Sequence, residues 1–186
     1  MSSASFTHQS VTLKYVTEDD LSDVQNILDH AAYYHSTIVQ TSPSGLAERC
    51  FHSEPPKLKD SRVFKRFMLV TDSSLSPAPI AALDIFVGFP NYKTASIAMC
   101  VIREDFQRKG LGLKLLTEVI PAFLRETHPA VEQLSISLTE NNIPALRCLL
   151  KAKYEQTNRW EKLNIHNKPV IALTYKRNVR QQAPNS

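Results

Sequence analysis

Residues 105–116 read DFQRKGLGLKLL, and the six residues QRKGLG (107–112) within this stretch decide how the rest of the chain is interpreted. The chain has 4 glycines in 186 residues, and two of them stand two positions apart here. Glycine has no Cβ, so another group can approach its backbone closely. An apolar, helix-like run follows, and the first N–H groups of a helix are unpaired and favour an anion. The stretch therefore predicts a phosphate-binding turn, or alternatively a tight turn with two solvated bases.

The segments on both sides of the turn predict a mixed α/β sheet. Residues 94–102 form an apolar strand upstream, and a helix from residue 113, interrupted by Pro121, leads to a strand at 132–139 downstream. A strand–helix–strand crossover implies a parallel pair, whereas hairpins imply antiparallel pairs. The other predicted elements are a strand at 11–16, a helix after Thr17, a short helix at 44–52, hairpin strands at 66–72 and 80–89, a helix at 141–152, and strands at 157–163 and 169–176.

The common phosphate loops do not fit the glycine turn. The pattern Gly-x-x-x-x-Gly-Lys-Ser/Thr is absent, and a dinucleotide-binding Gly-x-Gly-x-x-Gly would need a glycine where Leu115 stands. The stretch QRKGLG instead resembles the Gln/Arg-x-x-Gly-x-Gly/Ala loop of the GNAT superfamily of N-acetyltransferases. This resemblance covers about residues 11–177, because the order of the predicted elements matches as well.

Further segments on both sides of the turn carry the resemblance to the GNAT superfamily. AMCVIREDF (98–106) stands where the family has its central strand. More loosely, residues 25–44 and 88–93 are similar to the phosphinothricin-acetyltransferase-like branch. The family's helix signature reads N-x-x-A-x-x-L-Y-x-K-x-G-F. In this chain its specified positions are occupied by Asn142, Ala145, Cys148, Leu149, Lys151, Lys153 and Tyr154.

The resemblance implies a GNAT-like fold and an enzyme. The fold would be a mixed, mostly antiparallel sheet with helices on both faces, whose central parallel strand pair splays around the cofactor. A single domain would span residues 11–177, and the polar ends predict a flexible leader at 1–10 and a disordered tail at 178–186. The enzyme would transfer the acetyl group of acetyl-CoA to a primary amine of a small molecule, by direct attack of the neutral amine on the thioester.

The resemblance also implies a cofactor site. The pyrophosphate of acetyl-CoA would bind the backbone N–H groups of residues 108–112, at the loop that Gln107 starts. The free backbone edge of the strand at 99–102 would meet the pantetheine amides, and Asn142 would reach the pantetheine arm. The cofactor-binding residues would thus be Cys100, Val101, Ile102, Gln107, Arg108, Lys109, Gly110, Leu111, Gly112 and Asn142.

Candidates for the acceptor pocket follow the first helix, where GNAT enzymes commonly build it. Tyr33, Tyr34 and His35 could line this pocket, with His35 as a proton acceptor, or could only pack over the sheet. Asp84 is the only carboxylate in the strand at 80–89 and could bind the amine or act as a base, or could face solvent. The candidates for substrate binding are Tyr33, Tyr34 and Asp84, and those for catalysis are Asp84, His35 and Tyr154.

The helix signature departs from the family at the usual general acid. Leu149 stands where the family has a tyrosine that protonates the leaving thiolate, and Lys153 replaces a glycine. Tyr154 is the nearest tyrosine, and we expect it to pack beyond the helix end. Leu149 therefore leaves a non-catalytic acyl-CoA-binding or regulatory module as an alternative function. Acetylation of a protein N-terminus or lysine is a further alternative. The sequence leaves the acceptor amine open.

Composition argues against several classes of function. The net charge of +4 favours an anionic ligand but is small for a nucleic-acid-binding protein. The 3 cysteines and 6 histidines show no metal-ligand spacing. The cysteines are typical of reduced thiols, and no base is visible near Cys100 that would make it a nucleophile. No stretch approaches the ~18 apolar residues of a membrane span, and the N-terminus lacks the pattern of a signal peptide. We expect a cytoplasmic protein without a metal, membrane or nucleic-acid partner, and the resemblance adds a homodimer.

Overall fold

The computed structural model describes residues 5–39, 42–59, 62–165 and 168–180. These residues contain one eight-stranded sheet with the strand order β1-β2-β3-β4-β5-β6-β8-β7. Every neighbouring pair is antiparallel except β5 and β6, which run parallel. The prediction of a mixed, mostly antiparallel sheet with one parallel pair is confirmed. The strands are β1 (Ser5–His8), β2 (Val11–Tyr15), β3 (Phe64–Asp72), β4 (Ala81–Val87), β5 (Thr94–Ile102), β6 (Gln133–Thr139), β7 (Glu155–Ile165) and β8 (Lys168–Asn178).

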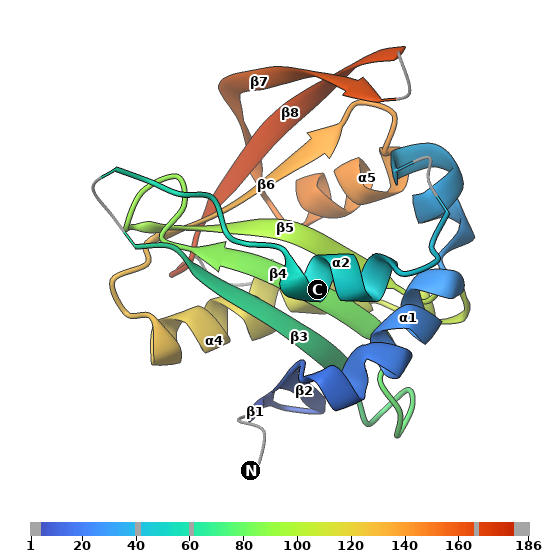
Figure 1. Cartoon of the computed structure of the whole chain (residues 1–186). Helices are drawn as coiled ribbons and strands as arrows, with labels where there is room; N and C mark the ends of the chain where they lie inside the picture. Colours follow the sequence, from blue (N-terminus) through green and yellow to red (C-terminus); the bar gives the residue numbers. More distant parts are fainter. Residues whose placement is uncertain (1–4, 40–41, 60–61, 166–167, 181–186) are drawn as a thin grey trace.

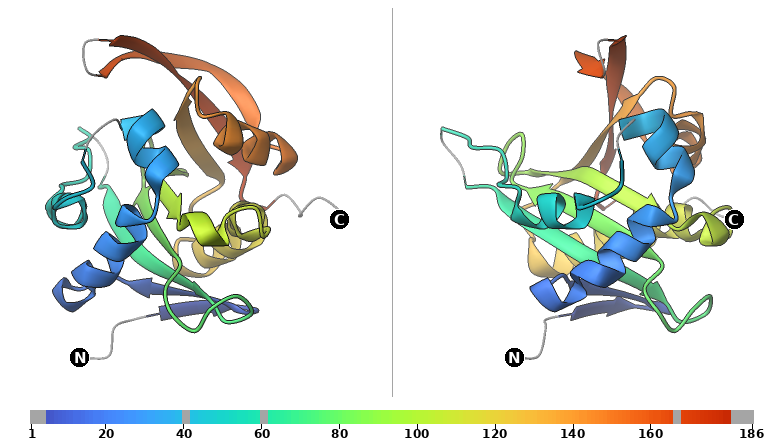
Figure 2. Two further views of the ribbon diagram at one scale, coloured as in Figure 1. Left: turned by 90° about the vertical axis from the view of Figure 1, so that its right-hand side faces the viewer. Right: turned by 45° about the vertical axis from the view of Figure 1, so that its right-hand side comes forward.

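Helices cover both faces of the sheet (Figures 1 and 2). One core joins the apolar sides of α1 and α2 to alternate residues of β3, β4 and β5, and the second core joins α3, α4 and α5 to the opposite face. Because side chains alternate along a strand, the central strands supply residues to both cores. The helices are α1 (Leu21–Asp29), α2 (Leu46–His52), α3 (Leu111–Lys114), α4 (Ile120–Thr127) and α5 (Ile143–Lys151).

The long helix predicted after the glycine turn is widened before Pro121. Residues Leu115–Val119 form a π-helical turn between α3 and α4, in which the N–H of Ile120 donates to the carbonyl of Leu115. Pro121 has no N–H to give the next carbonyl in this pattern, that of Leu116. Arg177 of β8 supplies the missing donor, because its Nη1 lies 3.1 Å from the Leu116 oxygen. The proline therefore shifts a backbone bond to a side chain from the sheet.

The ends of the chain contribute to the sheet beyond the predicted boundaries. Within the predicted leader, residues Ser5–His8 form β1 and pair with β2. Phe6 packs edge-on against Phe123 of α4, with ring centroids 5.6 Å apart. At the other end, Val179 is buried. Residues 1–4 and 181–186 lie outside the described residues.

Candidate active site

The parallel strands β5 and β6 separate halfway along their length. Their pairing joins residues 94–97 to residues 133–136 and goes no further among the described residues. Beyond that point β5 continues beside β4, while β6 continues beside β8 (Figure 1). In the described part of the sheet, the backbone of residues 98–102 therefore has no strand partner on the β6 side, as the family resemblance implied for residues 99–102.

A β-bulge lies where β5 leaves β6. In the β4–β5 ladder Asp84 pairs with Met99 and Ile85 pairs with Ile97, so Ala98 is an extra residue on β5. Ala98 is exposed although both of its neighbours are buried. Bulges redirect a strand and are frequent beside active sites. Asp84 thus lies opposite Met99, next to the bulge, on the strand that neighbours the one bordering the opening.

The glycine turn follows β5 after a short 3-10 turn at Glu104–Phe106, and it opens α3. Gly110 has φ +87° and Arg108 has φ +60°, so the turn uses the left-handed region twice. In the described part of the chain, none of the backbone N–H groups of residues 108–113 has a hydrogen-bond partner. A run of free N–H groups at a helix start is suited to a phosphate.

The two glycines of the turn have different surroundings. A Cβ on Gly110 would meet no atom within 4 Å, so the space beside this residue is open. A Cβ on Gly112 would lie 3.5 Å from both the Cys148 Sγ and the Ile102 Cδ1. Gly110 therefore faces open space, whereas Gly112 faces α5 and β5. Leu111 between them is 2% exposed, so only its backbone is available to a ligand.

Side chains of the turn fix its position against β5. Gln107 Nε2 donates to the carbonyl of Ile102 over 2.8 Å and ties the turn to the end of the strand. Lys109 Nζ lies 4.8 Å from the ring centre of Phe106, while Arg108 is exposed. Both cations thus lie at the surface beside the free N–H groups.

The β6–α5 connection forms the opposite wall of the opening. Asn142 caps α5, and its Oδ1 accepts the N–H of Ala145 at 3.4 Å. Next to it, the Asn141 carbonyl accepts a 3.2 Å hydrogen bond from the Tyr33 hydroxyl. The segment after α1 is therefore joined to the segment before α5, across the mouth between β5 and β6.

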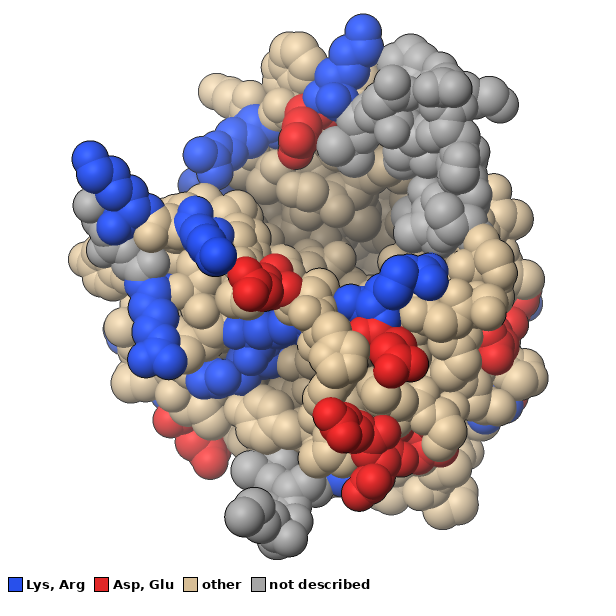
Figure 3. Space-filling view, viewed as in Figure 1, with Lys and Arg blue, Asp and Glu red and all other residues tan. Residues whose placement is uncertain are grey.

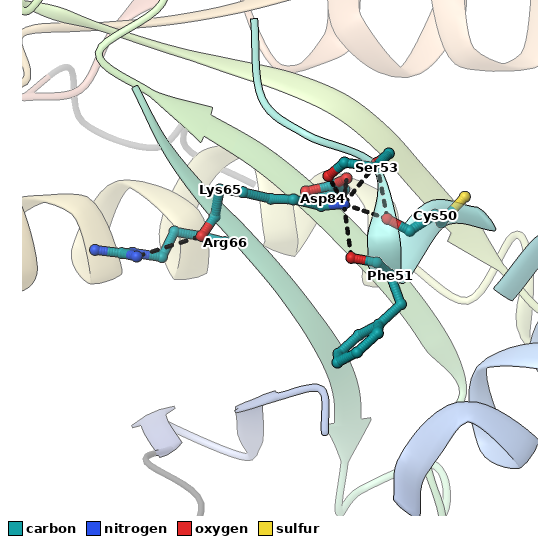
Figure 4. Close-up of polar contacts among 6 residues, drawn as sticks. All are labelled: Cys50, Phe51, Ser53, Lys65, Arg66 and Asp84. Carbon is teal, nitrogen blue, oxygen red and sulfur yellow. Dashed lines mark hydrogen bonds and ion pairs between the residues drawn. The ribbon is translucent and has the colours of Figure 1, made fainter. Parts of the chain in front are cut away.

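Asp84 is buried on the face that α2 covers. Its side chain is 7% exposed, and its Oδ2 lies 3.6 Å from the Lys65 Nζ (Figure 4). Its Oδ1 has no hydrogen-bond partner in the described part of the structure. Burial raises the pKa of Asp84 to about 6, and the nearby Lys65 ammonium opposes this shift. A carboxylate with this pKa is charged at neutral pH but is a stronger base than an exposed one.

His35 and Tyr34 lie in the π-helical turn Tyr34–Val39 after α1. His35 is 8% exposed, and its Nε2 lies 2.7 Å from the Leu28 carbonyl. Since a carbonyl only accepts, Nε2 carries the proton and Nδ1 is left with a lone pair. Among the described residues Nδ1 has no partner. Tyr34 packs in the α1–α2 core, and burial raises its pKa to about 12.

The candidates for general acid and nucleophile lie in the other core. Leu149 is 1% exposed, so its position faces this core. Tyr154 is also buried, its hydroxyl has no hydrogen-bond partner in the described part of the chain, and burial raises its pKa. Burial likewise raises the pKa of the Cys100 thiol to about 12, which disfavours the thiolate that a nucleophile needs. Val101 is buried in the α1–α2 core.

Two residues that the sequence interpretation missed organise these cores. Lys65 holds Asp84, and Arg177 holds the widened helix. The alternation of β3 carried a signal for Lys65, because it shares a strand face with Phe67 and Leu69, which are buried. A lysine at such a position indicates a buried charge that needs partners.

The face that carries α2 is hollowed. Figure 3 shows the hollow between the β7–β8 hairpin and the body of the molecule, with Lys and Arg side chains on its rim. The visible floor is formed mainly by residues that carry no charge. No group of three or more His, Cys, Asp or Glu in the described ranges could hold a metal ion. None of the described helices has the length and apolar character needed to cross a membrane.

The fold combines a sheet that opens between two parallel strands with a glycine turn whose backbone N–H groups are free among the described residues, and this arrangement suits an acyl-CoA-dependent transferase. The comparison with known families agrees, because the acetyltransferase (GNAT) family matches residues 44–154. The chain belongs to the GNAT family and is an acyl-CoA-dependent N-acetyltransferase. No curated protein matches the chain in sequence.

Solved structures of acetyltransferases share the fold. An acetyltransferase from Thermus thermophilus is 19% identical with a TM-score of 0.64, over 91% of this chain and 97% of that one. A ribosomal L7/L12 alpha-N-protein acetyltransferase in complex with coenzyme A is 12% identical with a TM-score of 0.68, over 94% and 98%. A protein identified as a phosphinothricin N-acetyltransferase is 18% identical with a TM-score of 0.60, over 92% and 100%. At these identities the likeness concerns the fold.

Proposed function

We propose that the protein transfers the acetyl group of acetyl-CoA to a primary amine of a small molecule, by direct attack of the amine on the thioester. The observation that carries this proposal is the buried Asp84 carboxylate, paired across the ladder with Met99 beside the β5 bulge. An amine must lose a proton to attack, and a base with a pKa of about 6 is ionised at neutral pH and ready to accept it. Asp84 is the proposed general base, acting directly or through a water.

The proposed cofactor site follows the opening between β5 and β6. The free N–H groups of residues 108–112 would bind the pyrophosphate, beside the exposed charges of Arg108 and Lys109. The free edge of residues 100–102 would pair with the pantetheine amides. The cap role of Asn142 leaves its Nδ2 available to the pantetheine arm.

A small acceptor is favoured by the contact across the mouth. The Tyr33 hydroxyl is bonded to the Asn141 carbonyl, so a bulky chain would have to break this bond to lie over the opening. Tyr33, Tyr34 and Asp84 are the proposed acceptor contacts, and His35 Nδ1 is a second candidate base. A protein N-terminus is the second candidate acceptor, because similar structures include ribosomal-protein acetyltransferases.

We propose a single domain across the described residues, because one sheet includes strands from both ends of the chain. A homodimer is proposed from the family resemblance, and light scattering of the purified protein would test it. A cytoplasmic location is proposed from the three free cysteines, and fractionation of cells would test it.

The test is release of coenzyme A thiol from acetyl-CoA with a panel of small primary amines and of peptides with free N-termini. Mass spectrometry of the acceptor identifies the acetylated nitrogen. Turnover of small amines well above that of peptides supports the proposal. Turnover of peptides alone would transfer the function to the second candidate.

A further inference from the structure

Lys65 is a buried cation whose hydrogen bonds are taken by the end of a helix. Its side chain is 14% exposed and extends from β3 toward α2 (Figure 4). Nζ donates to the Cys50 carbonyl, to the Ser53 carbonyl at 3.0 Å and to the Ser53 Oγ at 2.6 Å. The Phe51 carbonyl lies 3.4 Å away. An ammonium has three protons, so these oxygens occupy all of its donors.

The partners explain why the cation lies there. The last carbonyls of a helix have no intrahelical donor and carry the negative end of its dipole, and a lysine near that end stabilises both. Cys50 and Phe51 belong to the last turn of α2, and Ser53 follows it. Lys65 is therefore held by α2 independently of the carboxylate next to it.

The carboxylate of Asp84 is thus a second neighbour of the cation. At 3.6 Å, the distance from the Lys65 Nζ to the Asp84 Oδ2 is longer than a good hydrogen bond. The ammonium lowers the pKa of Asp84 chiefly through its charge, while its closest hydrogen bonds go to the end of α2. The other oxygen, Oδ1, has no hydrogen-bond partner among the residues described. One oxygen therefore lies beside a fixed cation, and the other is buried without a partner among the described residues.

We propose that Lys65 is a positioning residue for acetyl transfer: fixed by the end of α2, it keeps Asp84 ionised and leaves Oδ1 turned toward the acceptor amine. The inference rests on the proposed role of Asp84 as general base. It adds that the packing of α2 against β3 controls how strong that base is.

The charges around Asp84 determine the direction of the effect. Lys65 from β3 and the Ile85 backbone N–H from β4 lower the pKa of Asp84, against the effect of burial. From α2, the Cys50 thiol interacts with Asp84, and Lys65 and Arg49 act in turn on that thiol. Tyr34, after α1, interacts with Cys50. Lys65 is the cation in this group that meets the carboxylate directly, so its removal should raise the pKa of Asp84.

The test uses Lys65→Gln, since the amide can still donate to the α2 carbonyls but carries no charge. Lys65→Arg restores the charge. Lys57→Gln is the matched control, because the Lys57 side chain is 89% exposed and pairs with Glu54. The titration of Asp84 is followed by NMR of protein labelled at the aspartate carboxyl carbons, assigned with Asp84→Asn. The pH dependence of kcat/KM is measured on the same variants.

We expect the Asp84 midpoint to rise by about one pH unit in Lys65→Gln, since a nearby opposite charge shifts a pKa by roughly 1–3 units. The acid limb of the kcat/KM profile should move with it, and both should lie near the wild-type values in Lys65→Arg and Lys57→Gln. An unchanged midpoint in folded Lys65→Gln would overturn the inference. Full turnover in Asp84→Asn would instead overturn the proposed base, which separates the two failures. If Lys65→Gln does not fold, Ser53→Ala, which loosens the ammonium, must move the midpoint, or the inference is wrong.

Discussion

Replacing Asp84 by asparagine should change how stability depends on pH. The pKa of this carboxyl is raised from 3.8 to about 6 in the folded protein. At 1.36 kcal/mol per pH unit, the difference means that the buried charge costs about 3 kcal/mol above pH 7. Because the folded-state pKa is the higher one, the folded protein takes up the proton first as pH falls, and wild type gains stability below pH 7.

The size of the gain follows from the two pKa values. Between pH 7.5 and pH 5, titration from 3.8 in the unfolded chain and from about 6 in the folded one stabilises wild type by about 1.4 kcal/mol. Asp84→Asn has no proton to gain at this site. The difference in unfolding free energy between the two proteins should therefore shift by about 1.4 kcal/mol in favour of wild type. His128, whose pKa is lowered by burial, is common to both proteins and cancels in the difference.

The assay is urea unfolding of both proteins at several pH values from 7.5 to 5. Glu54→Gln removes one exposed carboxylate and controls for the change in net charge. If the curves of unfolding free energy against pH run parallel for wild type and Asp84→Asn, Asp84 is not a buried base with a raised pKa. The reasoning about the site would then be refuted.

Three further changes test other parts of the structure. Gly110→Val should lower the affinity for acetyl-CoA at least ~10-fold, because hydrogen bonds to a charged group are lost. Gly45→Val is the control, since Gly45 also has a left-handed backbone (φ +66°), and it should leave the affinity unchanged in calorimetry. Tyr154→Phe removes a buried hydroxyl that has no partner among the described residues, so the unfolding free energy should rise by about 1 kcal/mol. Turnover should stay within a few-fold of wild type, and a large loss of turnover would make Tyr154 the general acid. Burial raises the pKa of Asp72, but hydrogen bonds from Ser74 and Ser10 outweigh it, so the pKa is lowered overall. The charged Asp72 therefore stabilises the fold above pH 3.8, and this stabilisation is lost as pH falls through the folded-state pKa. Asp72→Asn should therefore be about 1–3 kcal/mol less stable at neutral pH, and this deficit should shrink below pH 3.8 in unfolding experiments; a constant deficit would contradict the assignment.

The elements of the fold could be predicted from the sequence because they depend on local periodicity. The alternation in residues 132–139 and the apolar stripe after residue 113 specify a strand and a helix without knowledge of their partners. The prediction of a flexible leader at residues 1–10 did not anticipate β1, which is stabilised by pairing with β2 and by Phe123 of α4. Such contacts are distant in sequence and leave no local signal.

The site could be predicted only in part for the same reason. QRKGLG indicated a backbone anion site, but the pattern alone predicts the same role for both of its glycines. Their difference depends on Cys148 of α5, which lies beside Gly112 and not beside Gly110. The partnership of Lys65 with Asp84 joins two strands and a helix end, so the sequence interpretation missed it, and the alternation around Lys65 is the local signal that could have indicated its burial. The bulge at Ala98 depends on the register of β4 against β5.

The most direct test of acetyl transfer by this site is the turnover of Asp84→Asn with the best amine of the panel, measured with its acetyl-CoA affinity. Loss of a general base should slow turnover by about 10²–10⁴-fold. The affinity for acetyl-CoA should stay at the wild-type value, because the turn at residues 107–112 is unchanged. Turnover within a few-fold of wild type, with the cofactor still bound, would contradict the account.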